Sequence, residues 1–301
     1  MEPLVTKDIF TIVTDQIIQK LEQGVIPWKQ PWKNAGPPVN LITRRPYRGI
    51  NCLLLNSLGY AENEFLTFKQ VQDVGGRVKK GEKANLVILW VWVDETKRMQ
   101  TVEAVARKYP CLRYYHVFNV TQCTGIPPRS GTLFEPKQND PIVRCEEIIE
   151  AMPNRPKIVH NENNAYYETW ADFINMPKMA VFESSESYYA TLFHELVHST
   201  GYEDRLNRKE ITESNAFGSE SYSIEELVAE IGTCYLTSYA GIAMNGLTNS
   251  VAYIQGWLER LKQDRKCIVY ASAHAQKAVD YILKIKRDEN DIVEHLQNEV
   301  A

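Results

Sequence analysis

Residues 188–204, YYATLFHELVHSTGYED, contain the pattern that decides the fold, a pair of histidines separated by three residues. In a helix, residues four apart project from the same face on successive turns, so the imidazoles of His194 and His198 can bind one ion. Zinc is the ion that this spacing typically serves. Glu195 is placed to hold a water at the ion and to take its proton. The stretch therefore predicts a metal-bearing helix over about 186–200, with Glu195 as the catalytic base.

A hydrolytic zinc site needs a third protein ligand, and the segment EELVAE offers two glutamates one helical turn apart, Glu226 and Glu230. In a gluzincin arrangement, one helical glutamate binds the metal, and an acid four residues later accepts a hydrogen bond from a ligand histidine. This arrangement assigns Glu226 as the ligand and Glu230 as its support. Ser223 and Glu226 also have the S-x-x-E spacing of a helix cap, and in that case Glu230 is the ligand.

Asp204 is a candidate of a different kind. The stretch HELVHSTGYED has the spacing H-E-x-x-H-x-x-G-x-x-D, which is similar to the metzincin pattern. In that pattern Gly201 turns the chain so that Asp204 returns to the metal, and Met244 lies beneath the site. Asp204 also stands beside an arginine, with which it can form a surface ion pair. From spacing alone, Glu226, Glu230 and Asp204 all remain open as the third ligand.

Composition places the chain among globular proteins. It has 301 residues, of which 44% are hydrophobic and 24% charged. The longest apolar run, residues 86–93, is too short to cross a bilayer, so we expect no membrane segment. The first residues, MEPLVTKDIF, lack the apolar core of a secretory signal. Six cysteines without a C-x-x-C pair are typical of reduced thiols, and we expect a cytoplasmic protein.

The charge is divided unevenly along the chain. The formal net charge is −4, but residues 1–140 carry 19 Lys and Arg against 13 Asp and Glu, a balance of +6. Residues 141–301 carry the remaining 15 against 25, a balance of −10. A basic half joined to an acidic half indicates a polyanionic partner for the first half.

Tryptophan and lysine alternate in PWKQPWK, residues 27–33, and RRPYRGIN follows at 44–51. Flat aromatic faces allow bases to stack and nearby cations hold phosphates, so this composition predicts binding of single-stranded DNA. The alternative is that the tryptophans pack into the core and the basic residues are merely solvated. The residues predicted to contact DNA are Trp28, Lys29, Trp32, Lys33, Arg44, Arg45, Tyr47, Arg48 and Asn51, with Lys69, Arg77, Lys79, Lys80 and Lys83 from a basic turn that follows.

Hydrophobic periodicity predicts an α+β protein of two domains. Residues 1–130 are expected to form a small mixed α/β domain with a β-sheet, residues 131–140 a linker rich in turn-forming residues, and residues 141–301 a domain in which a small sheet precedes helices. Strands are predicted at 86–93, 112–120, 157–160, 166–171 and 179–183, and the second of them can pair with the first. Helices are predicted at about 143–152, 186–200, 223–240, 247–263 and 266–287. The last helix has an apolar stripe typical of core packing, comprising Ile268, Ala271, Ala275, Ala278, Val279, Ile282 and Leu283.

Many ordered segments of the chain resemble one family. They are LEQGVIPWKQPW (21–32), PVN (38–40), RPYRGIN (45–51), LTFKQ (66–70), GGRVKKGEK (75–83), YYHVFNVTQCTG (114–125), HELVHSTG (194–201), RLNR (205–208), EELVAEIG (225–232), WLERLKQDRK (257–266) and AQKAVDYI (275–282). The chain resembles the ArdC-type antirestriction proteins of conjugative plasmids. Proteins of this type have an N-terminal single-stranded DNA-binding domain and a C-terminal zincin-like metallopeptidase domain.

The resemblance implies that the chain protects incoming DNA from host restriction during plasmid transfer. It implies a metallopeptidase site that uses Zn²⁺ or another divalent ion such as Mn²⁺, and it favours a glutamate of EELVAE over Asp204 as third ligand. The partners that it implies are single-stranded DNA, with duplex DNA as a further candidate, and a host restriction-modification protein.

Two other classes of function remain open from the sequence. One is a DNA-binding shield whose metal site is structural and not catalytic. The other is a direct protein inhibitor, in which the acidic half at 141–301 contacts a restriction enzyme by imitating the charge of DNA.

Overall fold

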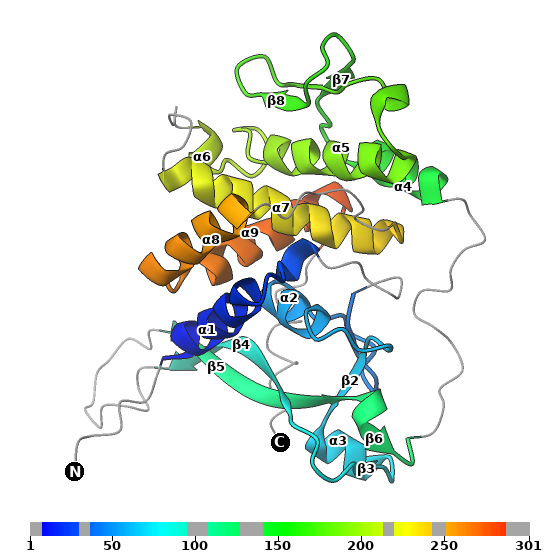
Figure 1. Ribbon diagram of the computed structural model, residues 1–301, viewed down its shortest axis with the longest axis vertical. Coiled ribbons are helices and arrows are strands. Elements are labelled where there is room, and N and C mark those ends of the chain that lie inside the picture. The colour runs from blue at the N-terminus through cyan, green and yellow to red at the C-terminus, as the bar shows by residue number, and fades with distance from the viewer. Residues whose placement is uncertain are drawn as a thin grey trace.

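A mixed sheet lies in the N-terminal half of the chain, and helices dominate the C-terminal half (Figure 1). The structure is a computed structural model that describes residues 8–29, 37–94, 108–126, 141–212, 220–242 and 251–286. Within these residues the helices are α1 (Ile9–Glu22), α2 (Ile50–Asn56), α3 (Phe68–Asp73), α4 (Pro141–Ala151), α5 (Ser185–Ser199), α6 (Lys209–Thr212), α7 (Glu220–Ala240), α8 (Val251–Gln263) and α9 (Cys267–Ile282). The strands are β1 (Val39–Asn40), β2 (Glu64–Thr67), β3 (Arg77–Val78), β4 (Asn85–Asp94), β5 (Lys108–Asn119), β6 (Cys123–Thr124), β7 (Lys157–Val159), β8 (Tyr166–Glu168) and β9 (Phe173–Asn175). These elements confirm the predicted α+β class.

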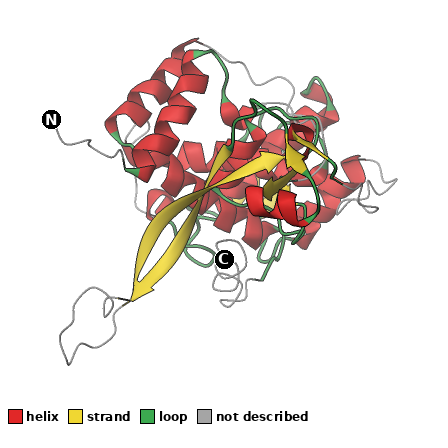
Figure 2. Ribbon diagram, turned by 90° about the horizontal axis from the view of Figure 1, so that it is seen from below, coloured by secondary structure: helices red, strands yellow, loops and turns green. Residues whose placement is uncertain are grey.

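The first sheet has the strand order β1-β2-β5-β4, in which β1 is parallel to β2 and the other pairs are antiparallel. The predicted pairing of 86–93 with 112–120 is confirmed, because β4 pairs with β5 from Asn85 opposite Val117 to Asp94 opposite Lys108. The β-branched and aromatic residues of β4 favour a strand. Strand β2 pairs only with residues 117–119 at the end of β5. Away from these residues, β4 and β5 continue as a two-stranded ribbon (Figure 2).

A second sheet precedes the metal-bearing helix, with the order β7-β9-β8. The prediction of a strand at 179–183 is wrong, because Met179–Val181 form a 3-10 turn, η4. In this turn the N–H of Val181 donates to the carbonyl of Lys178 at 3.0 Å. The third strand is instead β9. Burial explains the difference, since Ile174 in β9 is completely buried, whereas Val181 is 64% exposed and gains nothing from pairing.

Helix α7 packs against both α5 and α9, and these three helices form the centre of the C-terminal half (Figure 1). The stripe predicted on the last helix is confirmed as core. The fully buried residues of that stripe are Ile268, Ala271, Ala275, Ala278, Val279 and Ile282, and Leu283 packs against them. Small alanines on α9 allow its backbone to approach α7 closely. None of the described helices has the length and apolar character needed to cross a membrane.

The main hydrophobic core contains residues from both halves of the chain. Val13, Ile17 and Leu21 of α1 are buried in the same cluster as the residues of α5, α7 and α9. Helix α1 packs against α8, and α2 packs against α9. The described parts of the predicted domains, 1–130 and 141–301, therefore share one core. The predicted linker at 131–140 lies outside the described residues, and the domain boundaries remain predictions.

We predict opposite effects from alanine at two helical glycines. A Cβ at Gly232 in α7 would lie 2.8 Å and 2.9 Å from the two Cγ atoms of Val197 in α5, whereas a Cβ at Gly256 in α8 would meet open space. Gly232→Ala should reduce the free energy of unfolding by about 1–3 kcal/mol, because α7 has to move away from α5. Gly256→Ala should raise that free energy by up to about 1 kcal/mol through helix propensity. Urea unfolding of both variants measures the difference, and a Gly232→Ala variant as stable as Gly256→Ala would contradict the close packing.

Candidate metal centre

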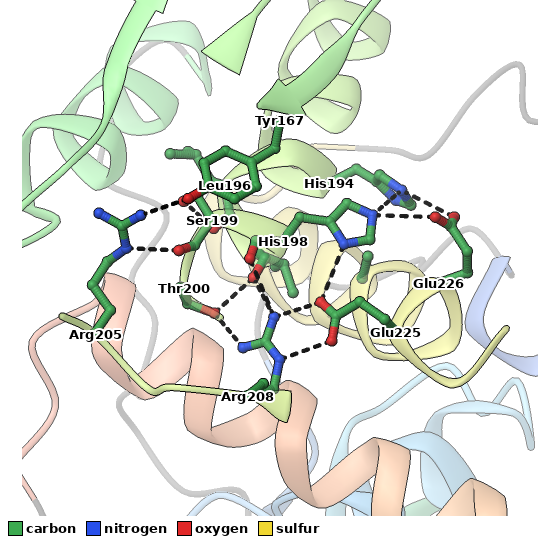
Figure 3. Close-up of polar contacts among 12 residues, drawn as sticks. Tyr167, His194, Leu196, His198, Ser199, Thr200, Arg205, Arg208, Glu225 and Glu226 are labelled. Carbon is green, nitrogen blue, oxygen red and sulfur yellow. Dashed lines mark hydrogen bonds and ion pairs between the residues drawn. The ribbon is translucent and has the colours of Figure 1, made fainter. Parts of the chain in front are cut away.

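Helix α5 places the two histidines of the H-E-x-x-H pattern one turn apart at its C-terminal end. Its first turn is capped by Ser184, whose hydroxyl accepts the N–H of Ser187 at 3.2 Å. The apolar residues of α5 face the core, which holds the helix in place, and the Nε2 atoms of His194 and His198 lie 3.1 Å apart (Figure 3). The four-residue spacing in the sequence thus brings the two imidazoles together on one face of α5.

The carboxylate of Glu226 in α7 completes the group. Its Oε2 lies 3.5 Å from Nε2 of His194, and its Oε1 lies 3.5 Å from Nε2 of His198 (Figure 3). Among the described residues, these three side chains form a group whose ligand atoms all lie within 4.8 Å of one another. Glu230 and Asp204 are not part of this group. The arrangement brings Glu226 to the histidines, as the sequence-based assignment expected.

The spacing of these atoms fits a tetrahedral divalent ion. Ligand bonds of about 2.0–2.1 Å in tetrahedral geometry separate neighbouring ligand atoms by roughly 3.3 Å. The observed separations of 3.1 Å and 3.5 Å bracket that value. His198 is almost buried, while His194 and Glu226 are partly exposed. The group is thus covered on one side and open to a substrate on the other.

Glu225, the neighbour of Glu226, contacts the ring nitrogen of His198 that does not face the ligand group. Its Oε1 lies 3.1 Å from Nδ1 of His198, so Nε2 is the atom left to face the ligand group (Figure 3). A carboxylate at this position fixes the tautomer and orientation of a ligand histidine. The sequence assigned such a supporting role to Glu230, which stays a prediction, whereas the carboxylate that the structure places at His198 is Glu225.

Arg208 neutralises Glu225 in the interior. Its guanidinium donates through Nε to Oε2 of Glu225 at 2.9 Å and through Nη2 to Oε1 at 2.5 Å. The same group donates to the hydroxyl of Thr200 at 2.6 Å and to the carbonyl of Val197 at 2.9 Å, both at the end of α5. Arg208 and Glu225 are 4% and 3% exposed. A buried and bidentate pair of this kind fixes α7 against the end of the metal-bearing helix.

The carboxylates determine the charge of the site. Burial by itself lowers the pKa of His198, but hydrogen bonds and Coulombic attraction from Glu225 and Glu226 outweigh burial and raise this pKa to about 10. Burial raises the pKa of Glu226, while the two histidines outweigh it and lower that pKa below the usual range. The two glutamates therefore give the histidine pair a surrounding that favours positive charge.

A second arginine braces the end of α5 from the other side. Arg205 donates through Nε to the carbonyl of Ser199 at 2.6 Å and through Nη2 to the hydroxyl of Tyr167 at 3.0 Å (Figure 3). Its partner carboxylate is Asp172, not the adjacent Asp204. Because Tyr167 is in β8, this contact fixes the second sheet against the metal-bearing helix. Asp204 is exposed, and Met244, its companion in the metzincin alternative, lies outside the described residues.

The catalytic candidate, Glu195, is 8% exposed and follows His194 directly on α5. Its neighbours on the helix, Leu196 and Val197, are completely buried in the core. Glu195 therefore has little freedom to move away from the histidine pair, as a general base needs.

Two of the aromatic residues predicted to stack on DNA bases, Trp28 and Tyr47, are buried instead. Trp28 is completely buried and packs edge-to-face on Trp257 at 5.9 Å between ring centroids. Tyr47 is 7% exposed and packs edge-to-face on Phe65 at 6.2 Å. A buried ring has no face available for a base, so stacking by these two residues is wrong. Trp28 is buried because η1 (Pro27–Lys29), which carries it, packs against α1 and α7.

Arg48 and Asn51 have partners inside the protein. Arg48 forms an ion pair with Asp280 of α9. The side chain of Asn51 donates to the carbonyl of Ile88 at 2.6 Å and accepts its N–H at 2.7 Å, which ties α2 to β4. Both residues thus have an internal role, and their contact with DNA stays a prediction.

The remaining predicted DNA contacts divide into three groups. Arg44 forms an ion pair with Glu64 at 2.6 Å, and Arg45 is partly buried. Trp32, Lys33 and the side chain of Lys29 lie outside the described residues. Five cations are exposed on α3, β3 and the turn before β4, and they are Lys69, Arg77, Lys79, Lys80 and Lys83. This set, the basic surface, is the part of the prediction that the structure leaves available to a polyanion.

Two family models match the two halves of the chain. Residues 7–118 match the N-terminal domain of anti-restriction factor ArdC, and residues 144–274 match a zincin-like metallopeptidase domain. The fold is similar to crystal structures of the antirestriction protein ArdC from the R388 plasmid, one metal-free and one Mn(II)-bound. Both have a TM-score of 0.74, with 34% and 33% sequence identity, and they cover 92% of this chain and 97% and 98% of the other. The chain belongs to the ArdC family of antirestriction proteins.

Similarity to curated proteins agrees with membership of the ArdC family. The uncharacterized protein y4eC of Sinorhizobium fredii is 32% identical over 293 residues, which are 93% of each chain. Two Escherichia coli proteins named DNA primase TraC are 32% identical over 308 and 304 residues. This chain spans only 20% and 28% of those two proteins, so the similarity concerns one portion of each.

Sequence reasoning missed Glu225 and Arg208, although both lie in segments that resemble the ArdC family, EELVAEIG and RLNR. Helical periodicity could have found Glu225, since residues 225 and 226 point to different sides of the same turn. No spacing rule pairs Arg208 with a glutamate 17 residues later, because α6 lies between them and Glu225 belongs to another helix, α7.

We predict that Glu225→Gln weakens binding of a divalent ion by about 10- to 100-fold, because His198 loses the carboxylate that orients it. Glu259→Gln, which removes the same charge from an exposed position on α8, should bind the ion as the unchanged protein does. Titration with Mn²⁺ or Zn²⁺ by calorimetry measures both affinities, and unfolding in chelator measures stability separately. Equal affinities for the two variants would show that Glu225 has no role at the metal.

Proposed function

We propose that this protein binds single-stranded DNA and carries a zinc-dependent peptidase site, and that it protects incoming DNA from host restriction during conjugation. The observation that supports this most strongly is the convergence of His194, His198 and Glu226, backed by buried Glu225, in a chain of the ArdC family. The ArdC relative from R388 has a Mn(II)-bound structure, so Mn²⁺ is the second candidate for the ion.

The residues of the chain have separable roles in the proposed reaction. His194, His198 and Glu226 hold the ion, and the partly exposed side of this group receives the substrate. When bound, the ion polarises a peptide carbonyl and makes water more acidic. Glu195 accepts the proton of the attacking water and returns it to the amine of the departing peptide. Glu225 keeps the Nε2 atom of His198 directed at the ion throughout.

The test of catalysis is Glu195→Gln, compared with Glu186→Gln on the same helix. We expect Glu195→Gln to retain metal and DNA binding, because Glu195 is not in the ligand group, and to lose at least about 100-fold in peptidase activity. Glu186→Gln should retain activity. The readouts are cleavage of a peptide library and transfer of an unmodified plasmid into a restricting recipient. Full protection by the Glu195→Gln variant would mean that the protein acts as a DNA-binding shield with a structural metal.

The basic surface is the proposed site of phosphate contact. Its five cations lie on consecutive elements of the N-terminal half, α3, β3 and the turn before β4. Lys79 also donates to the carbonyl of Thr121 at 2.7 Å, which holds this turn against η3 (Val120–Gln122). Cations gathered on neighbouring elements attract a phosphate backbone without reading its sequence.

We predict that a double variant, Lys79→Gln with Lys80→Gln, weakens binding of single-stranded DNA and makes that binding less sensitive to salt. Each lost phosphate contact should reduce the slope of log affinity against log salt by about 0.7. The matched control removes two exposed lysines of the C-terminal half, Lys157→Gln with Lys277→Gln, and should leave the slope unchanged. Fluorescence anisotropy with a labelled oligonucleotide at several salt concentrations gives the slopes, and equal slopes in all three proteins would exclude this surface.

A further inference from the structure

One face of the β4–β5 ribbon carries aromatic rings that face solvent. Side chains alternate between the faces of a strand, and residues paired across an antiparallel ladder share a face. Ile88 pairs with Tyr114, Trp90 with Leu112, and the next residue on this face of β5 is His116. Trp90 and Tyr114 are 39% and 49% exposed, and His116 lies edge-on to Tyr114 at 5.6 Å between ring centroids. The ribbon therefore presents three rings on one side.

Helices α1 and α9 continue this row of rings. Phe10 of α1 lies 6.1 Å from Trp90 and 6.1 Å from Tyr270 of α9, measured between ring centroids, with tilted planes in both cases. Tyr270 is 48% exposed. Figure 1 shows α1 beside the β4–β5 ribbon. Three segments distant in the sequence thus build one row, the aromatic stripe, which comprises His116, Tyr114, Trp90, Phe10 and Tyr270.

The exposure of Trp90, Tyr114 and Tyr270 contrasts with the burial of the aromatic residues in the core. Trp28, Phe65 and Tyr235 are each no more than 2% exposed, because burial of an aromatic ring stabilises the folded chain. Trp90, Tyr114 and Tyr270 forgo that stabilisation. Rings that remain in water while lying in a defined row are suited to a ligand that covers them.

Positive charge lies at both ends of the aromatic stripe. The exposed ammonium of Lys266 lies 5.6 Å from the ring centroid of Phe10. At the other end, Lys79, Lys80 and Lys83 of the basic surface directly precede β4. From residue 83 to Trp90 a strand spans about 23 Å, which a single-stranded oligonucleotide of a few nucleotides covers. The stripe approaches the basic surface through His116, which pairs with Leu86 near the start of β4.

The character of the stripe favours bases over a protein partner. The exposed large aliphatic side chains of the described residues are Leu58, Ile142, Val143, Met179 and Val181, and none of them is on β4, β5, α1 or α9. A protein interface normally surrounds its aromatic residues with a packed apolar core. Separate rings accompanied by cations are instead the arrangement that stacks unpaired bases.

We propose that the aromatic stripe is the platform on which unpaired bases of single-stranded DNA stack, while the basic surface holds the phosphates of the same strand. This inference rests on the proposed DNA-binding function and names the residues that recognise the strand as single. It also replaces Trp28 and Tyr47, which are buried, with rings that have free faces.

The experiment compares two oligonucleotides of equal charge, a twelve-residue oligothymidylate and an abasic strand of the same length, in binding to the full chain. We expect the unchanged protein to prefer the oligothymidylate. Tyr114→Ala with Tyr270→Ala should weaken binding of oligothymidylate by about 5- to 100-fold for each ring and leave abasic binding unchanged. Tyr114→Phe with Tyr270→Phe, which keeps the rings, should restore the preference. Trp170→Ala, which removes a ring that is 89% exposed near β8, is the matched control and should have no effect.

The outcomes separate this inference from the function on which it rests. Equal binding of both oligonucleotides by the unchanged protein would overturn the stacking platform and leave DNA binding intact. Loss of affinity for both strands in the alanine variant would overturn it as well, since the effect would then not depend on bases. Binding of neither strand by the unchanged protein would overturn the proposed DNA-binding function together with the platform.

A second readout uses the intrinsic fluorescence of Trp90. A stacked base quenches an indole, so oligothymidylate should quench the unchanged protein more than it quenches a Trp90→Phe variant, which keeps a ring at this position. The chain has six tryptophans, and the difference between these two proteins isolates the contribution of one. Identical quenching would show that no base reaches Trp90.

Discussion

The buried pair formed by Arg208 and Glu225 is the interaction on which the candidate site depends. Glu225 fixes the inner histidine, and Arg208 fixes both Glu225 and the carbonyl groups at the end of α5. Removing one member of such a pair leaves an unpaired charge in the interior, at a cost of about 3–5 kcal/mol. The pair therefore couples the orientation of His198 to the packing of α5 against α7. A metal site on two helices needs that coupling, because its ligands come from both.

Helix α7 also connects this site to the N-terminal half. Nine residues after Glu226, the hydroxyl of Tyr235 donates to the carbonyl of Gly49 at 2.7 Å, and the N–H of Gly49 donates to Gln276 of α9 at 3.0 Å. Gly49 has φ +52° and ψ −136°, a conformation that side chains rarely permit, at the start of α2. The segment RPYRGIN is thus part of the junction between the two halves. Contacts to the N-terminal half and the contact that orients His198 thus both come from α7.

The aromatic residues show how tertiary structure divides one residue type between two roles. Trp28 and Trp257 pack edge-to-face in the interior, where they join η1 to α8. Trp90 and Tyr270 each contact Phe10 and remain partly exposed to solvent. Both pairs combine residues distant in the sequence, and composition alone treats all four in the same way. What separates them is whether a helix covers the ring.

The sequence by itself determined the metal-bearing helix, its histidine pair, the α+β class, the ArdC resemblance and the pairing of β4 with β5. The helix, the histidine spacing and the class follow from periodicity, because the period of a helix or strand is a property of the local backbone. The resemblance rests instead on the ordered matching segments. Glu226 could be preferred from the sequence, but its approach to His194 and His198 depends on how α7 crosses α5, with Gly232 against Val197. The support from Glu225 and Arg208, the burial of Trp28 and Tyr47 and the row of exposed rings were decided only by tertiary structure. Each of them depends on which surfaces of separate elements meet, and the free energy of that packing belongs to the contact and not to either segment alone.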